Sequence, residues 1–230
     1  MSCVCGIDVG SLKTPSFVAW CNAAEKRFYL DQYIPSHIEP LPKQPPGWGE
    51  PACIGFDAPQ GLPAPGEKVR LADKEAKTPT KVLPADRTEL ENWKLYRGLI
   101  QAGVEIFWSV YRWKSVCIPG LEQDCNGKTV VFETYPRYVI RRLWPGFKIP
   151  SKRKNPLAYI SEIYQRILGL GFSCPGILIP THDQVDAMLC ALAAFCFLEE
   201  ENQLPAGTVG NPPYVDQRCS VLREGLIVAP

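Results

Sequence analysis

The 230-residue sequence predicts an α/β fold in which a mixed sheet is flanked by helices. Short apolar runs near the N-terminus are joined by brief polar turns, which is typical of hairpin-linked strands. Two later apolar runs alternate with long stretches of helical periodicity, which is typical of a sheet covered by helices. Hydrophobic residues make up 46% of the chain and charged residues 21%, so a packed core is expected.

The first three expected strands span 3–9, 15–21 and 26–34, which are rich in aliphatic and aromatic residues. Segment 35–51 contains six prolines. Because proline lacks the amide donor and clashes with the preceding helical turn, this segment is expected to be an irregular connection. A fourth strand is expected over 52–57 and a fifth over 128–134, each with an acid near its end.

Helices are expected over 86–102, 136–144 and 156–170, with Asp86 or Thr88 capping the first and Gly103 ending it. The last helix begins at Thr181, because Gln184 follows at the spacing of a capping box. Segment 224–228 is a short closing strand or a surface segment. We expect residues 1–230 to form a single domain, in which 58–127 is an elaborated insertion between the fourth and fifth strands that could act as a lid.

Composition limits the partners and the compartment. The formal charge of +1 predicts no global attraction to polyanions, so any contact with nucleic acid must come from a local basic patch. No signal-like N-terminus and no run of about 18 apolar residues is present, so we expect a cytoplasmic protein without a membrane partner. The ten cysteines are expected to be reduced, and Cys3 and Cys5 lack the second ligand pair of a zinc site.

Acids stand at the ends of three expected strands: Asp8, Asp57 and Glu133. Ligands of α/β sheets bind at the carboxyl ends of strands, so these acids could converge if their strands are neighbours. Asp183 and Asp186 lie three residues apart on the last helix and can project from the same side.

Five carboxylates in one cleft repel one another and raise one another's pKa values unless cations neutralise them. Hard cations prefer oxygen ligands, so the sequence predicts a Mg²⁺ or Mn²⁺ site, with two ions that activate water for phosphodiester hydrolysis.

Each acid also has a structural interpretation. Asp183 could complement the helix dipole without any ligand, and Asp8 and Asp57 could accept hydrogen bonds from the turns that follow them. Glu133 and Asp186 lie beside apolar stretches, where an unpaired charge is costly, so each needs a partner or a metal. His182 could carry protons for the site, or it could simply begin the helix.

Five short motifs together resemble the family called domain of unknown function 429. They are Gly6-Ile7-Asp8, Phe56-Asp57-Ala58-Pro59-Gln60-Gly61-Leu62-Pro63, Glu133-Thr134-Tyr135-Pro136, His182-Asp183-Gln184-Val185-Asp186-Ala187 and Glu224-Gly225-Leu226-Ile227. The resemblance implies a ribonuclease H-like fold and a predicted nuclease. By position, it implies metal ligands at Asp8, Asp57, Glu133 and Asp186, with Asp183 next. The proline-rich segment 35–51 departs from the usual ribonuclease H pattern, in which a helix commonly follows the third strand.

The resulting hypothesis is a metal-dependent nuclease with a nucleic acid as its partner. A basic stretch without acids between its ends could bind backbone phosphates: Arg137, Arg141, Arg142, Lys148, Lys152, Arg153 and Lys154. The same stretch could instead be a solvated charged face.

Two other functions stay open. Segment 6–14 also resembles the first phosphate loop of actin-like sugar kinases, although those kinases enclose nucleotide between two domains and 230 residues are few for that. A catalytically silent binding or scaffold protein of the same fold is the third interpretation.

Overall fold

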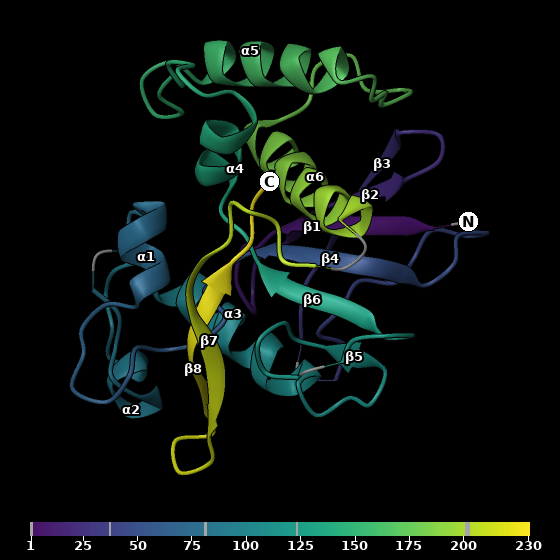
Figure 1. Cartoon of the computed structure of the whole chain (residues 1–230). Helices are drawn as coiled ribbons and strands as arrows, with labels where there is room; N and C mark the ends of the chain where they lie inside the picture. The colour runs from purple at the N-terminus through teal and green to yellow at the C-terminus, as the bar shows by residue number, and fades with distance from the viewer. Residues whose placement is uncertain (1, 37, 81, 123, 201–202) are drawn as a thin grey trace.

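The computed structural model describes residues 2–36, 38–80, 82–122, 124–200 and 203–230. Its centre is a mixed sheet in which eight strands are described (Figure 1). The strands are β1 (Cys3–Asp8), β2 (Ser16–Asn22), β3 (Arg27–Tyr33), β4 (Pro51–Asp57), β5 (Val116–Cys117), β6 (Thr129–Glu133), β7 (Val209–Asp216) and β8 (Val221–Ile227). Their order is β3-β2-β1-β4-β6-β8-β7, and β5 pairs with β6 outside this path.

Strand directions divide the sheet into three parts. In the hairpin-linked part, β2 runs antiparallel to both β1 and β3. Strand β4 runs parallel to β1, and β6 runs parallel to β4 and β8. The β7–β8 hairpin closes the far edge. The carboxyl ends of β1, β4 and β6 therefore meet at one edge of the sheet, where α/β proteins place their ligands.

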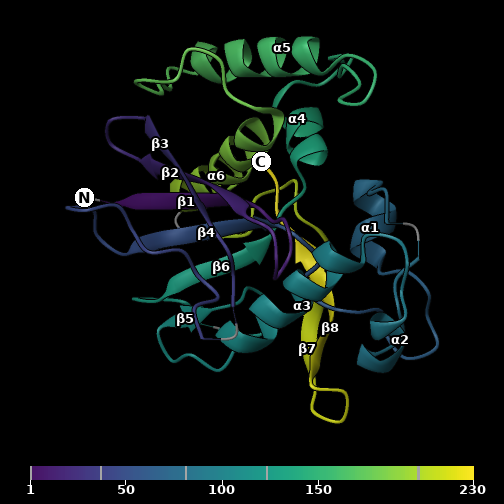
Figure 2. The ribbon, with the colours of Figure 1, turned by 180° about the vertical axis from the view of Figure 1, so that it is seen from behind.

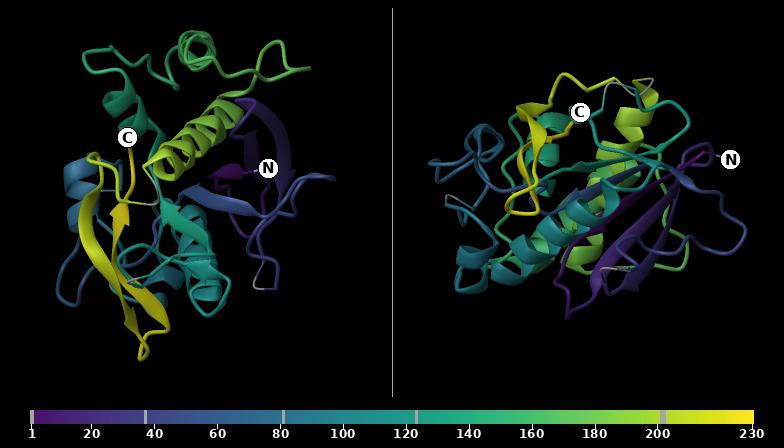
Figure 3. Two further views of the ribbon diagram at one scale, coloured as in Figure 1. Left: turned by 45° about the vertical axis from the view of Figure 1, so that its right-hand side comes forward. Right: turned by 90° about the horizontal axis from the view of Figure 1, so that it is seen from below.

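Helices cover both faces of the sheet. They are α1 (Leu71–Ala76), α2 (Arg87–Glu91), α3 (Arg97–Val110), α4 (Pro136–Leu143), α5 (Pro156–Gly169) and α6 (His182–Glu199). Helix α6 packs with α4 and α5 over one face, where its apolar side chains meet Val4, Cys53 and Phe132. Helix α3 packs on the opposite face against Ile7, Ile54 and Val131. Figure 2 shows α3 from the back of the molecule, and the view from below in Figure 3 separates α3 from α6 across the strands.

Most of the expected elements are confirmed. The first five expected strands correspond to β1–β4 and β6, and three expected helices correspond to α4, α5 and α6. Thr181 and Gln184 form the predicted capping box at the start of α6. The described residues between β3 and β4 contain no helix or strand, as the prolines require. That residues 1–230 form one domain, and that 58–127 act as a lid, stay predictions.

The expected helix over 86–102 is wrong in its bounds. Two helices occupy this region, and Tyr96 separates them with a left-handed backbone, φ 53°. Gly103 does not end α3, because the helix continues to Val110. A Cβ atom at Gly103 would lie 2.5 Å from the carbonyl oxygen of Pro59, so this glycine permits close packing instead. Helix α1 and strand β5 were not expected, and the C-terminal segment forms two strands where one was expected.

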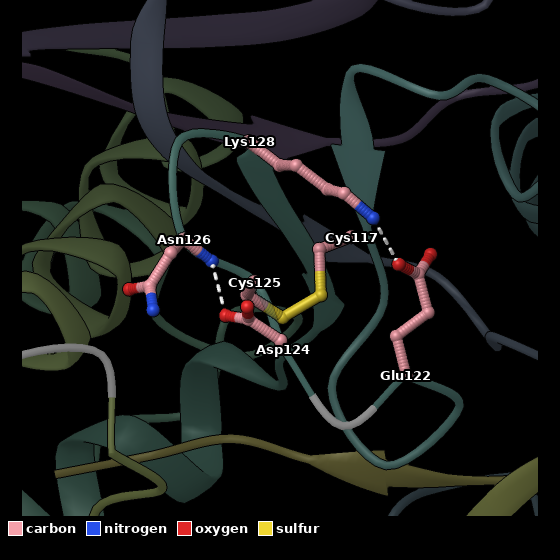
Figure 4. The surroundings of a disulfide bond; sticks show 6 residues. All are labelled: Cys117, Glu122, Asp124, Cys125, Asn126 and Lys128. Carbon is pink, nitrogen blue, oxygen red and sulfur yellow. Dashed lines mark hydrogen bonds and ion pairs between the residues drawn. A yellow bond between two sulfur atoms is a disulfide. The ribbon is translucent and has the colours of Figure 1, made fainter.

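One pair of cysteines corrects the expectation that all ten are reduced. Cys117 and Cys125 form a disulfide that links β5 to the connection preceding β6 (Figure 4). Their Cα atoms lie 5.3 Å apart, a separation typical of a disulfide. Six of the other eight cysteines are buried. Within the described residues, no helix is both long and apolar enough to cross a membrane.

Two glycines bring α6 unusually close to the sheet. Gly6 of β1 and Gly55 of β4 are paired in register. A Cβ atom at Gly6 would lie 2.0 Å from the amide nitrogen of Ala191 and 2.2 Å from the carbonyl oxygen of Ala187, both in α6. At Gly55, a Cβ atom would lie 2.8 Å from the carbonyl oxygen of Cys190. Real Cβ atoms do not approach backbone this closely, so this interface requires glycine.

Replacing Gly6 with alanine tests this contact. Because the added methyl would overlap helix backbone, we expect Gly6→Ala to lower the free energy of unfolding by about 3 kcal/mol or more, measured by urea denaturation. Gly169→Ala, at the exposed end of α5 with no atom near its Cβ position, is the matched control and should leave stability unchanged or slightly raised. Equal stability changes in the two variants would contradict the close contact.

Candidate metal centre

Three carboxylates meet where β1, β4 and α6 come together. Asp8 and Asp57 are the last residues of β1 and β4 and are paired in register. Since side chains alternate along a strand, they project from the same face as Gly6 and Gly55 two residues earlier, toward α6. Asp186 lies in the second turn of α6, next to Ala187, which contacts Gly6. One carboxylate oxygen from each aspartate lies within 4.8 Å of the other two.

We call Asp8, Asp57 and Asp186 the aspartate triad. Ligands on opposite sides of a Mg²⁺ ion, each about 2.1 Å from it, are about 4.2 Å apart. The oxygens of the triad are therefore spaced closely enough to share an ion after small side-chain adjustments. All three residues offer the hard oxygen ligands that Mg²⁺ and Mn²⁺ prefer.

The predicted acid Asp183 borders the triad. It lies one turn before Asp186 on α6, and its charge raises the pKa of Asp8. The exposed His182 lies beside it, with Nδ1 2.6 Å from Asp183 Oδ1. His182 therefore contacts the edge of the acidic group through Asp183, where a hydrogen-bond donor can orient a metal-binding carboxylate.

Burial and mutual repulsion shift the carboxyl groups of the triad. Burial raises the pKa of Asp8 well above its usual value, and the charges of Asp57 and Asp183 raise it further. Burial also raises the pKa of Asp57 to about 7, against the opposing effect of Lys152. A cation bound between these groups would remove the repulsion.

Lys152 is the basic residue that contacts the triad. Its ammonium group forms an ion pair with Asp186, whose other oxygen accepts a hydrogen bond from the hydroxyl of Tyr159. The ammonium also lies 5.1 Å from the centre of the Tyr159 ring. One third of the Lys152 side chain is exposed, and the residue belongs to the connection between α4 and α5. Lys152 thus partly neutralises the triad from a surface segment.

Glu133 does not join the triad. It is in register with Phe56, one residue before Asp57, and so projects from the opposite face of the sheet. Arg70 binds both of its oxygens at 2.6 and 2.7 Å, and the amide of Gln60 donates to it at 2.6 Å. Its contacts are those of a buried ion pair, and a ligand role for Glu133 stays a prediction.

Arg70 is the residue that sequence reasoning missed. Its side chain is fully buried and also pairs with Asp73 at 2.7 Å. We call Arg70, Asp73 and Glu133 the buried arginine network. The signal in the sequence was the apolar run before Glu133, because a carboxylate buried there requires a partner, but the sequence did not identify Arg70 as that partner.

A cavity of about 430 Å³ opens beside the triad and shares Asp57 with it, and Lys152, the ion-pair partner of Asp186, also lines it. We call it the basic cavity, because three cations line it and two of its three acids, Asp73 and Glu133, already bind Arg70. Its lining is Asp57, Ala58, Pro59, Asp73, Thr78, Pro79, Thr80, Tyr96, Leu99, Glu133, Thr134, Tyr135, Pro136, Arg137, Ser151, Lys152 and Arg153.

Only three residues of the predicted basic stretch line this cavity: Arg137, Lys152 and Arg153. The other four lie elsewhere: Arg141 donates to the carbonyl of Ala76, Arg142 donates to the carbonyl of Pro230 at 2.8 Å, and Lys148 and Lys154 are exposed. Local folding thus divides a run that is continuous in sequence into cavity residues and surface residues.

The loop after β1 uses its amides internally. Gly10 donates to Ser16 Oγ, and the amides of Lys13 and Thr14 both donate to Ser11 Oγ. A loop that cradles phosphate needs such donors pointing outward.

A profile of the family described as protein of unknown function (DUF429) matches residues 6–208. The chain belongs to the DUF429 family. The match spans β1 to α6 and includes every residue of the aspartate triad and of the buried arginine network. Comparisons with curated proteins and with solved structures gave no match. DUF429 membership carries no assigned activity, so the function must be argued from the site itself.

The raised pKa of Asp57 predicts a stability that depends on pH. A carboxyl group that holds its proton to about pH 7 when folded, but only to about pH 4 when unfolded, destabilises the fold progressively as the pH rises between those values. In metal-free buffer, Asp57→Asn should therefore be more stable than wild type at pH 8 and show a smaller advantage, or none, at pH 4.5. Urea denaturation at both pH values measures this. An effect of the substitution that is the same at both pH values would contradict the raised pKa.

Proposed function

We propose that this DUF429 protein is a divalent-metal-dependent phosphodiester hydrolase, a nuclease whose sheet has the ribonuclease H-like arrangement. The observation that carries the proposal is the aspartate triad, with one oxygen from each residue within 4.8 Å of the others at the carboxyl edge of β1 and β4. The order β3-β2-β1-β4-β6, with three hairpin-linked strands followed by two parallel ones, supports the fold assignment.

The triad fits a metal on the chemistry of its donors. The three residues are carboxylates, and Asp8 and Asp57 have raised pKa values. In the part of the chain that the structure describes, the cation paired with the triad is the partly exposed Lys152. Asp8, Asp57 and Asp186 would hold Mg²⁺ or Mn²⁺, and Asp183 could contribute to a second ion. The bound metal would supply Lewis acidity toward a phosphate oxygen and activation of the attacking water.

The chain's own residues have separate tasks in this proposal. Arg137 and Arg153 attract the phosphates of a substrate toward the cavity beside Asp57. Tyr159 holds Asp186 by a hydrogen bond and so fixes the orientation of this ligand. Lys152 pairs with Asp186 in the metal-free protein. Once a bound cation neutralises the triad, its ammonium group would be free to bind the substrate phosphate.

The amide pattern of the loop after β1 favours this function over an actin-like phosphotransferase. Gly10, Lys13 and Thr14 already donate to hydroxyl groups of the same loop, which leaves these donors unavailable for nucleotide phosphates.

Calorimetric titration with Mn²⁺ tests the metal site. Wild type should bind Mn²⁺, while Asp8→Asn and Asp186→Asn should each lose measurable binding because a ligand oxygen becomes an amide group. Asp31→Asn, an exposed acid on β3 far from the triad in sequence, is the matched control and should bind as wild type does. Binding that is insensitive to both triad substitutions would contradict the assignment.

The same variants test hydrolysis. With Mn²⁺ present, wild type should cleave labelled single-stranded DNA or RNA oligonucleotides. Asp186→Asn should be slower by about a thousandfold or more, because a metal contributes several kcal/mol to transition-state stabilisation. Mn²⁺ binding without cleavage of either type of oligonucleotide would instead identify a catalytically silent metal-binding protein.

A further inference from the structure

The basic cavity has the size of a small-molecule site. Its volume of about 430 Å³ falls within the range of about 300–1,000 Å³ that is usual for ligand pockets. Five separate segments line it, from the end of β4, α1 and its following loop, the start of α3, the start of α4, and 151–153. A cavity of this size receives one nucleotide-sized ligand, whereas a duplex requires a long open groove.

Two tyrosines contribute aromatic surface to this cavity. The side chain of Tyr96 is half exposed, at 51%, although tyrosine is a large and largely apolar residue. Its backbone has φ 53°, a left-handed conformation that is strained for a non-glycine residue and occurs often at ligand sites. Tyr135 lines the cavity at the start of α4 and is partly buried against the cluster of Ala72, Ala76 and Ile227. Aromatic faces that line a pocket can stack on nucleobases without sequence preference.

Two of the three cations that line the cavity, Arg137 and Arg153, are available for phosphate. Among the residues that the structure describes, no carboxylate forms an ion pair with Arg137 or Arg153. The polar groups on the opposite wall are already used, since the hydroxyls of Thr78 and Thr80 donate to Asp73 and the guanidinium of Arg70 binds Glu133. Tyrosine rings and free guanidinium groups therefore remain as the groups that can contact a ligand.

The cavity is also directly connected to the triad. Asp57 belongs to both, and Lys152 lines the cavity while it pairs with Asp186. Arg137 also lies near the triad, because its charge opposes the rise in the pKa of Tyr159. The hydroxyl of Tyr159 in turn donates a hydrogen bond to Asp186. A ligand that binds Arg137 and Arg153 through its phosphate would thus place this phosphate next to the carboxylates of the triad.

We propose that the basic cavity binds a single unpaired nucleotide of a nucleic-acid strand, with its base against Tyr96 and Tyr135 and its phosphate at Arg137 and Arg153. This inference rests on the proposed hydrolase function and narrows its substrate to strands that present an unpaired nucleotide. Paired bases would have to leave the stack to enter, at a cost of a few kcal/mol.

Adenosine 5′-monophosphate, titrated calorimetrically in buffer that contains EDTA, is the probe. Wild type should bind it more tightly than it binds inorganic phosphate or adenosine. Tyr96→Gly removes the ring and suits the left-handed backbone, and Arg153→Gln removes an exposed charge, so both variants should fold. Each should weaken binding by about tenfold or more, as expected for the loss of one stacking or phosphate contact.

Two matched controls accompany these variants. Lys154→Gln removes an exposed cation next to Arg153 but outside the cavity lining, and Tyr29→Thr removes a tyrosine that is 47% exposed on β3. Both should bind the nucleotide as wild type does. No nucleotide binding, an affinity no greater than that for phosphate, or equal losses in variants and controls would overturn the proposal.

The metal-free design separates this inference from the proposed function. Because EDTA removes divalent cations, nucleotide binding is measured independently of any metal at the aspartate triad. If the protein binds the nucleotide but does not bind Mn²⁺, the proposed hydrolase function is wrong and the nucleotide site is supported. Mn²⁺-dependent cleavage without nucleotide binding would refute only the nucleotide site.

Discussion

The backbone contact between Gly6 and α6 is the constraint on which the site depends. Because no side chain separates β1 from the helix at Gly6, and Gly55 repeats this on β4, the first turns of α6 lie directly above the strand ends. Two residues later on the same strand faces, Asp8 and Asp57 meet Asp186. The two glycines are therefore as necessary for the acidic cluster as the aspartates themselves. They set the position of the cluster through close packing of α6 on the sheet and not through electrostatic attraction.

Two groups of buried acids are neutralised in different ways. Glu133 and Asp73 share one fixed cationic partner inside the fold, Arg70, which is fully buried and always charged, and burial still raises the pKa of Glu133. Among the described residues, the cation paired with the triad is Lys152, from a surface connection, and Asp8 and Asp57 have raised pKa values. A permanently paired network is suited to supporting structure, whereas an incompletely neutralised one is suited to receiving a cation.

The sequence predicted the parts of this arrangement that depend on local patterns. Apolar runs located β1–β4 and β6, and the capping box of Thr181 located the start of α6. Side chains alternate between the two faces along β6, and this alternation places Glu133 on the face opposite the triad. Which face Glu133 takes depends on the strand register, which only the assembled sheet defines. The burial of Arg70 arises from contacts with a segment far away in the chain, and the break at Tyr96 from a left-handed residue within a helical pattern. The pairing of Cys117 with Cys125, eight residues apart, depends on the path of the connection between them. Periodicity reports none of these features.

The most direct test is anomalous diffraction from crystals of the wild-type protein grown with Mn²⁺. We expect an anomalous peak about 2.0–2.3 Å from oxygens of Asp8, Asp57 and Asp186, with the ammonium group of Lys152 displaced from Asp186. A crystal that contains Mn²⁺ elsewhere, or none at all, while Lys152 still pairs with Asp186 would show that the triad is not a metal site.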